Sequence, residues 1–340
     1  MALTDQSDRS PWPHRWAVAL ACATFPLVWV GGLVTTTDAG MAVPDWPNTY
    51  GYNLFLYPWQ SWLAGPWDLF VEHGHRMLAA TVGLITIGML FVFMRFERRN
   101  WVRGMGFAAL GLVIFQGALG GMRVLLDERT LAMLHGMTGP LFFGLTVALV
   151  VITSQSWQSG AVVDPQATTR GGNQIRAVAT VTAVLAYLQI VLGAVLRHVP
   201  VDAQPGAFLL AVKFHLFLAG ILTLHIVLLV GFVLSRALHS RPLGRLAGIL
   251  IGLVVLQLVL GTATWIVKYS VPYWATGWIS NSAVVIRDGG WLQTHVITAH
   301  VAIGSALFGT TVAIALYAHR LLSGSTVVQK ASGAKLGVAV

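Results

Sequence analysis

Charged residues are scarce in this chain of 340 amino acids, because Asp, Glu, Lys and Arg together make up only 10% of it. A soluble domain carries about 25% of these residues. The mean hydropathy is +0.72, and apolar runs of about 20 residues recur along the chain, which excludes a water-soluble globule. Cysteine is almost absent too: the single Cys22 excludes an intramolecular disulfide and a cysteine-based metal site.

The apolar runs predict an all-α polytopic membrane protein with eight transmembrane helices. The first run continues into a Gly- and Trp-rich loop without a small-residue cleavage site, so we interpret it as a retained helix and not as a removed signal peptide. The predicted helices lie near 16–37, 73–94, 104–122, 132–153, 176–196, 212–234, 245–267 and 292–318.

The net charge of +9 would be compatible with a nucleic-acid partner, but the distribution of the charge argues against one. Most Lys and Arg residues lie at one set of helix ends, and the long segment 38–72 holds none of them. The positive-inside rule then places both termini in the cytoplasm of a multi-pass cell-membrane protein. The basic charge needs no nucleic acid to explain it.

The segment 38–72 is rich in Trp and Tyr, which suits either an anchor in the lipid headgroup layer or a lid over a site on the outer side. By contrast, the inner segment 154–175 is polar and Gly-rich, as expected for a flexible linker between two halves. We therefore expect an N-terminal half at 1–153, a linker at 154–175, a C-terminal half at 176–320 and a cytoplasmic tail at 321–340.

The two halves share signals that indicate a tandem duplication of a four-helix unit. An even number of helices in each unit keeps both copies in the same orientation across the membrane. A QxxLG motif also recurs, and its small residues let helices or a flat ligand approach closely. The matching pairs are Gly32 with Gly193, His75 with His215, Gly120 with Gly261, and His135 with His300; the motifs begin at Gln116, Gln189 and Gln257.

Histidine in a membrane helix is costly and indicates a functional role. The histidines at 75, 135, 215 and 300 lie near the outer starts of four parallel helices, and thus at a similar depth. Two facing imidazoles in an apolar slot predict a bis-histidine site for heme iron, and two pairs predict two hemes. Zinc is the rival, but it usually takes four ligands and acidic partners are few here.

The other histidines carry weaker signals. We expect His73 to face outward or to support His75, and His295 to be a reserve ligand for His300. His225 lies deeper and is expected to hydrogen-bond a neighbouring helix, whereas His198 sits at the interface or beside a propionate. The three in cytoplasmic segments, expected to be merely polar, are His14, His239 and His319.

Glu72 precedes His75 by one helical turn in the sequence E-x-x-H-R. A carboxylate there can manage protons or position a substrate, or it can simply pair with Arg76 at i, i+4. The second half has Val212 at the equivalent place. This asymmetry favours one catalytic half.

Together these segments resemble the heme A synthase family over nearly the whole chain. The similarity lies in GGLVTTTDAGMAVPDWPNTYG, EHGHRMLA, QGALGGMRV, LHGMTGP and LGAVLRH, and in the His-bearing starts of the sixth and eighth helices. The resemblance implies oxidation of the heme O ring methyl to the formyl group of heme A. It also implies substrate heme between His75 and His135, heme b between His215 and His300, and Glu72 as the catalytic carboxylate.

The resemblance further implies heme O synthase as substrate donor, terminal oxidase assembly as product acceptor, and an electron-transfer partner. Many family members carry a cysteine pair in the first outer loop, which this chain lacks, and Leu216 stands where several have arginine. Two alternatives remain open at the level of sequence. One is a di-heme cytochrome b that only transfers electrons, and the other is a transporter built on the repeat.

Overall fold

A computed structural model describes residues 10–159, 171–200, 203–237, 240–271 and 289–322. The eight predicted helices are confirmed, and each is long and apolar enough to cross a bilayer. Most extend several residues beyond the apolar runs that predicted them. The elements are α1 (Trp12–Thr36), η1 (Leu54–Leu56), α2 (Trp59–Leu63), α3 (Trp67–Phe96), α4 (Asn100–Leu126), α5 (Arg129–Thr153), α6 (Gln155–Gln158), α7 (Gly171–Arg197), α8 (Pro205–Arg236), α9 (Arg241–Tyr269) and α10 (Trp291–Leu321).

Proline and the left-handed backbone region set several helix boundaries. α1, α8 and α9 each carry proline in the first two positions, where the missing N–H would have no helical partner. α4 ends at Asp127, whose φ of 50° lies in the left-handed region, a conformation that Asp tolerates better than most residues. These signals mark where the four helices begin or end.

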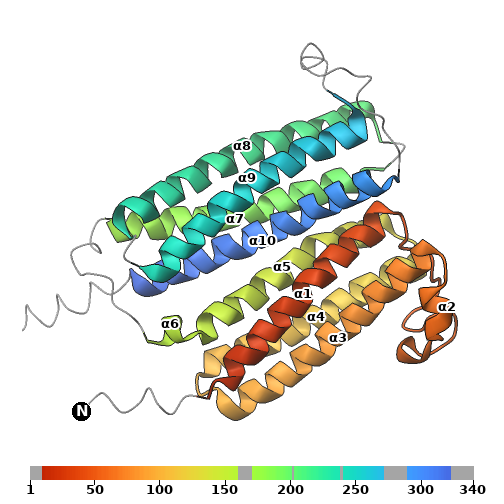
Figure 1. Cartoon of the computed structure of the whole chain (residues 1–340), viewed down its shortest axis with the longest axis horizontal. Helices are drawn as coiled ribbons and strands as arrows, with labels where there is room; N and C mark the ends of the chain where they lie inside the picture. Colours follow the sequence, from red (N-terminus) through yellow and green to blue (C-terminus); the bar gives the residue numbers. More distant parts are fainter. Residues whose placement is uncertain (1–9, 160–170, 201–202, 238–239, 272–288, 323–340) are drawn as a thin grey trace, which may run out of the picture.

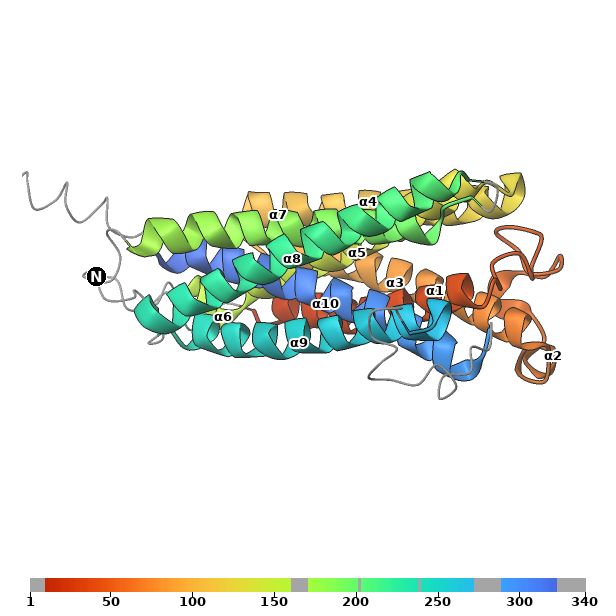
Figure 2. The same ribbon diagram turned by 90° about the horizontal axis from the view of Figure 1, so that it is seen from above.

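The spanning helices form two four-helix units (Figure 1). In the first, α1 packs on α3 and α5, and α4 packs on α3 and α5; in the second, α7 packs on α8 and α10, and α9 packs on α8 and α10. α1 therefore corresponds to α7, α3 to α8, α4 to α9, and α5 to α10. This packing follows the predicted repeat. The axes of all spanning helices are roughly aligned in Figure 2.

α5 and α10 lie at the centre, where the two units meet. Their contact is close because glycine faces an aromatic ring from each side. A Cβ added at Gly144 would lie 2.5 Å from Cε1 of Phe308, and one added at Gly309 would lie 3.1 Å from Cε1 of Phe143. Small residues of this kind let membrane helices approach closely.

Gly144→Val should therefore destabilise the contact between the two units. The added side chain has no space against Phe308, and overpacking of this kind costs about 1–3 kcal/mol. We expect a lower thermal unfolding midpoint in detergent. Gly111→Val is the matched control, since a Cβ at Gly111 meets nothing within 4 Å, and equal midpoints for both variants would contradict the assignment.

Candidate functional site

Four histidines form two facing pairs, one in each unit. The ring centres of His75 on α3 and His135 on α5 lie 6.2 Å apart, and those of His215 on α8 and His300 on α10 lie 6.4 Å apart. Each histidine follows the start of its helix by six to ten residues. The structure thus brings together all four predicted site histidines at a common depth.

Each of these imidazoles rests against a glycine of a neighbouring helix. A Cβ added at the glycine would lie 2.9 to 3.4 Å from Cε1 of the imidazole. The pairs are Gly31 with His75 (2.9 Å), Gly120 with His135 (3.2 Å), Gly193 with His215 (3.4 Å) and Gly261 with His300 (3.1 Å). The sequence comparison paired Gly32 with Gly193, which is wrong by one residue. Gly31 contacts His75, whereas Gly32 faces Thr298 on α10. His75 thus lies against α1, His135 against α4, His215 against α7 and His300 against α9.

The two pairs fit an iron ion between their rings. An imidazole nitrogen lies about 2 Å from a metal that it binds, so two rings that share one ion have centres roughly 6 Å apart. Nδ1 of His75 and Nδ1 of His300 are buried and have no hydrogen-bond partner among the residues that the structure describes. Nδ1 of His135 lies 3.2 Å from the carbonyl oxygen of Gln116. If Nδ1 donates there, Nε2 keeps its lone pair for a metal.

The donor set does not resemble a zinc site. Over the described ranges, no group of three or more His, Cys, Asp or Glu residues could hold a metal ion. Structural zinc takes four such ligands and catalytic zinc three. Two imidazoles per site instead suit a metal whose other ligands come from a macrocycle, as in heme.

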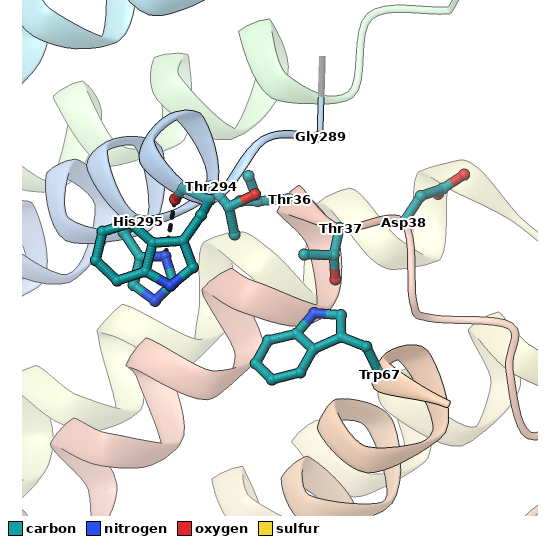
Figure 3. A pocket seen from close by; sticks show the side chains of 8 residues that line it. Thr36, Thr37, Asp38, Trp67, Gly289, Thr294 and His295 are labelled. Atoms are coloured by element: carbon teal, nitrogen blue, oxygen red, sulfur yellow. Dashed lines mark hydrogen bonds between the residues drawn. The ribbon is translucent and has the colours of Figure 1, made fainter. Parts of the chain in front are cut away.

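The structure resolves the geometry of the two histidines of α10. His300 faces His215, whereas His295 stacks on Trp291 with ring centres 4.2 Å apart. His295 lines an open cavity of about 420 Å³ at the outer end of the bundle (Figure 3), together with Thr36, Thr37, Asp38, Trp67, Gly289, Trp291 and Thr294. The reserve ligand therefore does not lie in the histidine pair.

Of the two alternatives expected for His73, the outward-facing one is wrong, because its side chain is only 2% exposed. Its Nδ1 lies 3.0 Å from Oγ1 of Thr49, and its ring packs between Tyr57 and Trp62. His73 projects from a different face of the helix than His75, and this direction places its side chain under the first outer loop and not toward lipid. Sequence spacing gave the direction but could not show that the loop covers it.

The remaining histidines have local roles or none that is visible. Nδ1 of His225 has no hydrogen-bond partner, so the expected bond to a neighbouring helix is not found at this atom. Nδ1 of His198 pairs with the carbonyl oxygen of Ala194 on its own helix. His14 and His319 are more than surface polar groups, since they contact hydroxyls of Thr153 and Thr180. His239 lies outside the described residues.

Glu72 is 3% exposed, and both of its carboxylate oxygens accept hydrogen bonds. Nη2 of Arg76 donates to Oε1 at 2.7 Å, and the amide of Val43 donates to Oε2 at 2.9 Å. The ion pair at i, i+4 therefore exists, and it is buried. Because a buried pair is much costlier to break than an exposed one, Glu72 has a structural role whatever else it does.

Arg76 fastens the first outer loop to α3. It donates to the carbonyl oxygens of Val43, Asp45 and Asn48 at 2.6 to 2.9 Å. Sequence reasoning missed this clamp, because nothing in the spacing of the loop shows where its carbonyl groups point. The only available signal was a basic residue one turn after Glu72 in an outer segment that otherwise lacks positive charge.

The same loop also covers the outer end of α4. Nη2 of Arg123 donates to the carbonyl oxygen of Gly40 at 2.8 Å, and the indole of Trp46 lies where a Cβ on Gly121 would be. The loop therefore contacts the helix that carries His75 and the helix that cradles His135. This segment therefore lies over the end of the first unit that holds its histidine pair.

Fold and site together define a polytopic α-helical membrane protein with a duplicated four-helix unit and a bis-histidine slot in each copy. A family model described as "Cytochrome oxidase assembly protein", COX15-CtaA, matches residues 66–201, a range from the start of α3 to the end of α7. Over that range the chain is similar to this family.

The similar curated proteins are named heme A synthase. The one from Alkalihalophilus pseudofirmus is 25% identical over 68% of this chain and 80% of its own length. The one from Caulobacter vibrioides is 31% identical over 44% of this chain and 43% of its own, and the one from Lysinibacillus sphaericus 24% identical over 42% and 45%. The chain thus spans less than half the length of two of these three relatives.

Acid should release the first outer loop through Asp45. Burial raises the pKa of this carboxyl, but hydrogen bonds from the amides of Gly51 and Tyr50 and the charge of Arg76 outweigh it and hold the pKa below its usual value. A carboxyl whose pKa is lower in the folded than in the unfolded state stabilises the fold at pH values above its unfolded pKa of about 3.9. This stabilisation is lost as the pH falls through the pKa of the folded state. Protease cleavage of the loop should therefore rise at low pH.

Asp45→Asn should reproduce this release at neutral pH, because it removes the charge and one of the two acceptor oxygens. Asp127→Asn is the matched control, since Asp127 is exposed in another outer turn and Asn also tolerates its left-handed backbone. Equal cleavage rates for the two variants would show that Asp45 does not hold the loop.

Proposed function

We propose that this protein is a heme A synthase, a membrane oxidoreductase that converts the ring methyl of heme O to the formyl group of heme A. The observation that carries the proposal is the pair of bis-histidine slots, of which, among the residues that the structure describes, only the first is joined to a buried carboxylate and a covering loop. The names of the similar proteins supply the product, heme A, and the family resemblance of the sequence implies heme O as the substrate. Two histidine pairs in similar surroundings would suit an electron carrier, whereas a carboxylate beside only one of the pairs suits an enzyme.

In this proposal, His75 and His135 hold the substrate heme O, and His215 and His300 hold a resident heme b. When bound, heme b supplies one-electron transfer. The apolar residues and the cradling glycines give each macrocycle a slot between helices. Zinc chemistry has no support from the donor set of the described residues.

Glu72 is the proposed proton acceptor. Oxidation of a methyl group to a formyl group releases protons, and a positioned carboxylate near the reacting group can take them up. A proton on Glu72 would remove the charge that Arg76 pairs with. Proton uptake by Glu72 would thereby be coupled to the hydrogen bonds with which Arg76 holds the first outer loop. In this proposal, that loop limits water access to the first slot while substrate is bound.

The proposed membrane orientation and partners follow from the charge distribution and from the family resemblance. The protein would lie in the cell membrane with both termini in the cytoplasm, and the two slots would open toward the outer half of the bilayer. Heme O synthase would supply the substrate, terminal oxidase assembly would consume the product, and a redox protein or carrier would exchange electrons. The N-terminal half would be catalytic, and the C-terminal half would hold heme b.

His300→Ala should abolish the low-spin bis-imidazole spectrum of the heme that copurifies with the protein, because it removes one axial ligand of the second pair. His295→Ala is the control, since this residue lies in the outer cavity and not opposite His215. The absorption and electron paramagnetic resonance spectra measure the effect. Loss of the spectrum in the His295 variant alone would reverse the assignment.

Coexpression with a heme O synthase tests the reaction itself. Extracted pigments should contain heme A in cells with the wild-type protein, and its absence would eliminate the proposed function. Glu72→Gln should stop formyl formation or stall it at the hydroxylated intermediate, while heme stays bound in the second half.

The buried ion pair requires a matched control for this variant. Arg76→Gln breaks the same pair but leaves the carboxylate, so we expect both variants to lose thermal stability, Arg76→Gln to slow conversion and only Glu72→Gln to stop it. Asp45→Asn shows separately what loosening of the loop does. Equal loss of conversion in the Glu72 and Arg76 variants would reduce Glu72 to a structural role.

A further inference from the structure

A glutamine lies four residues before three of the four cradling glycines. Gln116 precedes Gly120 on α4, Gln189 precedes Gly193 on α7, and Gln257 precedes Gly261 on α9. On α1, the residue four before Gly31 is Leu27. Because residues four apart share a helix face, three histidines have an amide beside them and His75 has an isobutyl group.

Two of the amides reach the neighbouring helix at the histidine itself, and the third reaches it one turn further along. Nε2 of Gln189 donates to the carbonyl oxygen of His215 at 3.0 Å and lies 3.2 Å from both of its ring nitrogens. Nε2 of Gln116 donates to the carbonyl oxygen of His135 at 3.4 Å. Nε2 of Gln257 lies 3.1 Å from where Gly304, one turn after His300, would carry a Cβ.

All three amide oxygens lack a donor. Oε1 of Gln116, Gln189 and Gln257 is buried with no hydrogen-bond partner. An unsatisfied buried acceptor costs about 1–3 kcal/mol. At Gln189 and Gln257, the two equivalent positions of the second half, such atoms indicate a donor that appears when the site is loaded.

The imidazoles provide such a donor. A neutral imidazole that binds iron through Nε2 carries its proton on Nδ1, and an acceptor for that proton fixes the ring and strengthens the ligand. His135 has a backbone acceptor in the carbonyl oxygen of Gln116. Within the described chain, Nδ1 of His300 makes no hydrogen bond of good geometry, although the backbone of Gln257 lies near it, and Nδ1 of His215 has only the amide of Gln189.

We propose that Gln189 and Gln257 are positioning residues that hold the two histidines of the second half as iron ligands, and that Leu27 leaves His75 as the exchangeable ligand of the first half. In the loaded site the amide would turn so that Oε1 accepts the Nδ1 proton, since at Gln189 it is Nε2 that lies 3.2 Å from Nδ1 of His215. Both rings of the second pair gain this support, whereas His75 has no acceptor for its Nδ1.

This inference rests on the proposed function and deepens it. A resident heme should stay bound through many turnovers, while a substrate heme must enter and its product must leave. Weak support at one of two axial ligands lets that ligand dissociate first, with the macrocycle still held by His135. The difference between the two slots would then lie in one residue of the repeat, at Leu27.

Gln257→Met tests the positioning role in the full-length protein with its copurified heme. Methionine keeps the size and removes the acceptor, so heme transfer to apomyoglobin should accelerate roughly tenfold and the midpoint potential should rise, because a weaker donor favours ferrous iron. Gln257→Glu restores an acceptor and should reverse both changes. Gln189→Met makes the same test at the opposite ring.

Leu253→Met is the matched control, one turn before Gln257 in the same helix. Transfer rates and potentials of both glutamine variants within about twofold of this control would overturn the positioning role. That outcome is distinguishable from failure of the proposed function: if His300→Ala kept the low-spin spectrum, the ligand pair itself would be wrong.

Leu27→Gln tests the first half, in a His215→Ala/His300→Ala background whose remaining pair is His75 with His135. Hemin titrated into this protein should dissociate more slowly with Leu27→Gln than without it. Leu112→Gln, a partly buried leucine one turn before Gln116, is the control for an added amide. Equal dissociation rates in the two glutamine variants would show that Leu27 does not make His75 exchangeable.

Discussion

The fold depends on one steric constraint, the contact of an imidazole with the bare backbone of a glycine on the next helix. At Gly31, Gly120, Gly193 and Gly261 an added Cβ would lie 2.9 to 3.4 Å from the Cε1 atom of a histidine ring. Without a hydrophobic driving force between helices in lipid, close packing of this kind sets which helices associate. The same contact therefore fixes the helix pairs, the depth of the histidines and the distance between facing rings.

The two units use this common frame differently. The first adds a buried ion pair between Glu72 and Arg76 and a loop that Arg76 fastens through three carbonyl groups. In the second, Val212 stands in place of Glu72, and glutamines accompany both histidines. A duplicated scaffold thus keeps its packing while polar residues at a few equivalent positions separate a fixed site from one that can open.

Hydrophobic runs and repeated His and Gly residues were enough to predict the eight helices and the four histidines that come together, since helix length and depth follow from rise per residue. The choice between His295 and His300 needed the structure, because both lie near the outer start of one helix and only packing shows which ring meets His215. The one-residue error at Gly32 has the same origin. Neighbouring glycines are equivalent in sequence, but they face different helices.

Glu72 shows why burial and function are hard to separate in a membrane site. Its burial excludes water, which strengthens the attraction to Arg76 and would also strengthen its influence on a reacting group. A carboxylate engaged by Arg76 and by the amide of Val43 stays fixed in place, as positioning of a proton acceptor requires. The interactions that make Glu72 structural are thus the ones that would hold it ready for proton transfer, so the two roles reinforce each other.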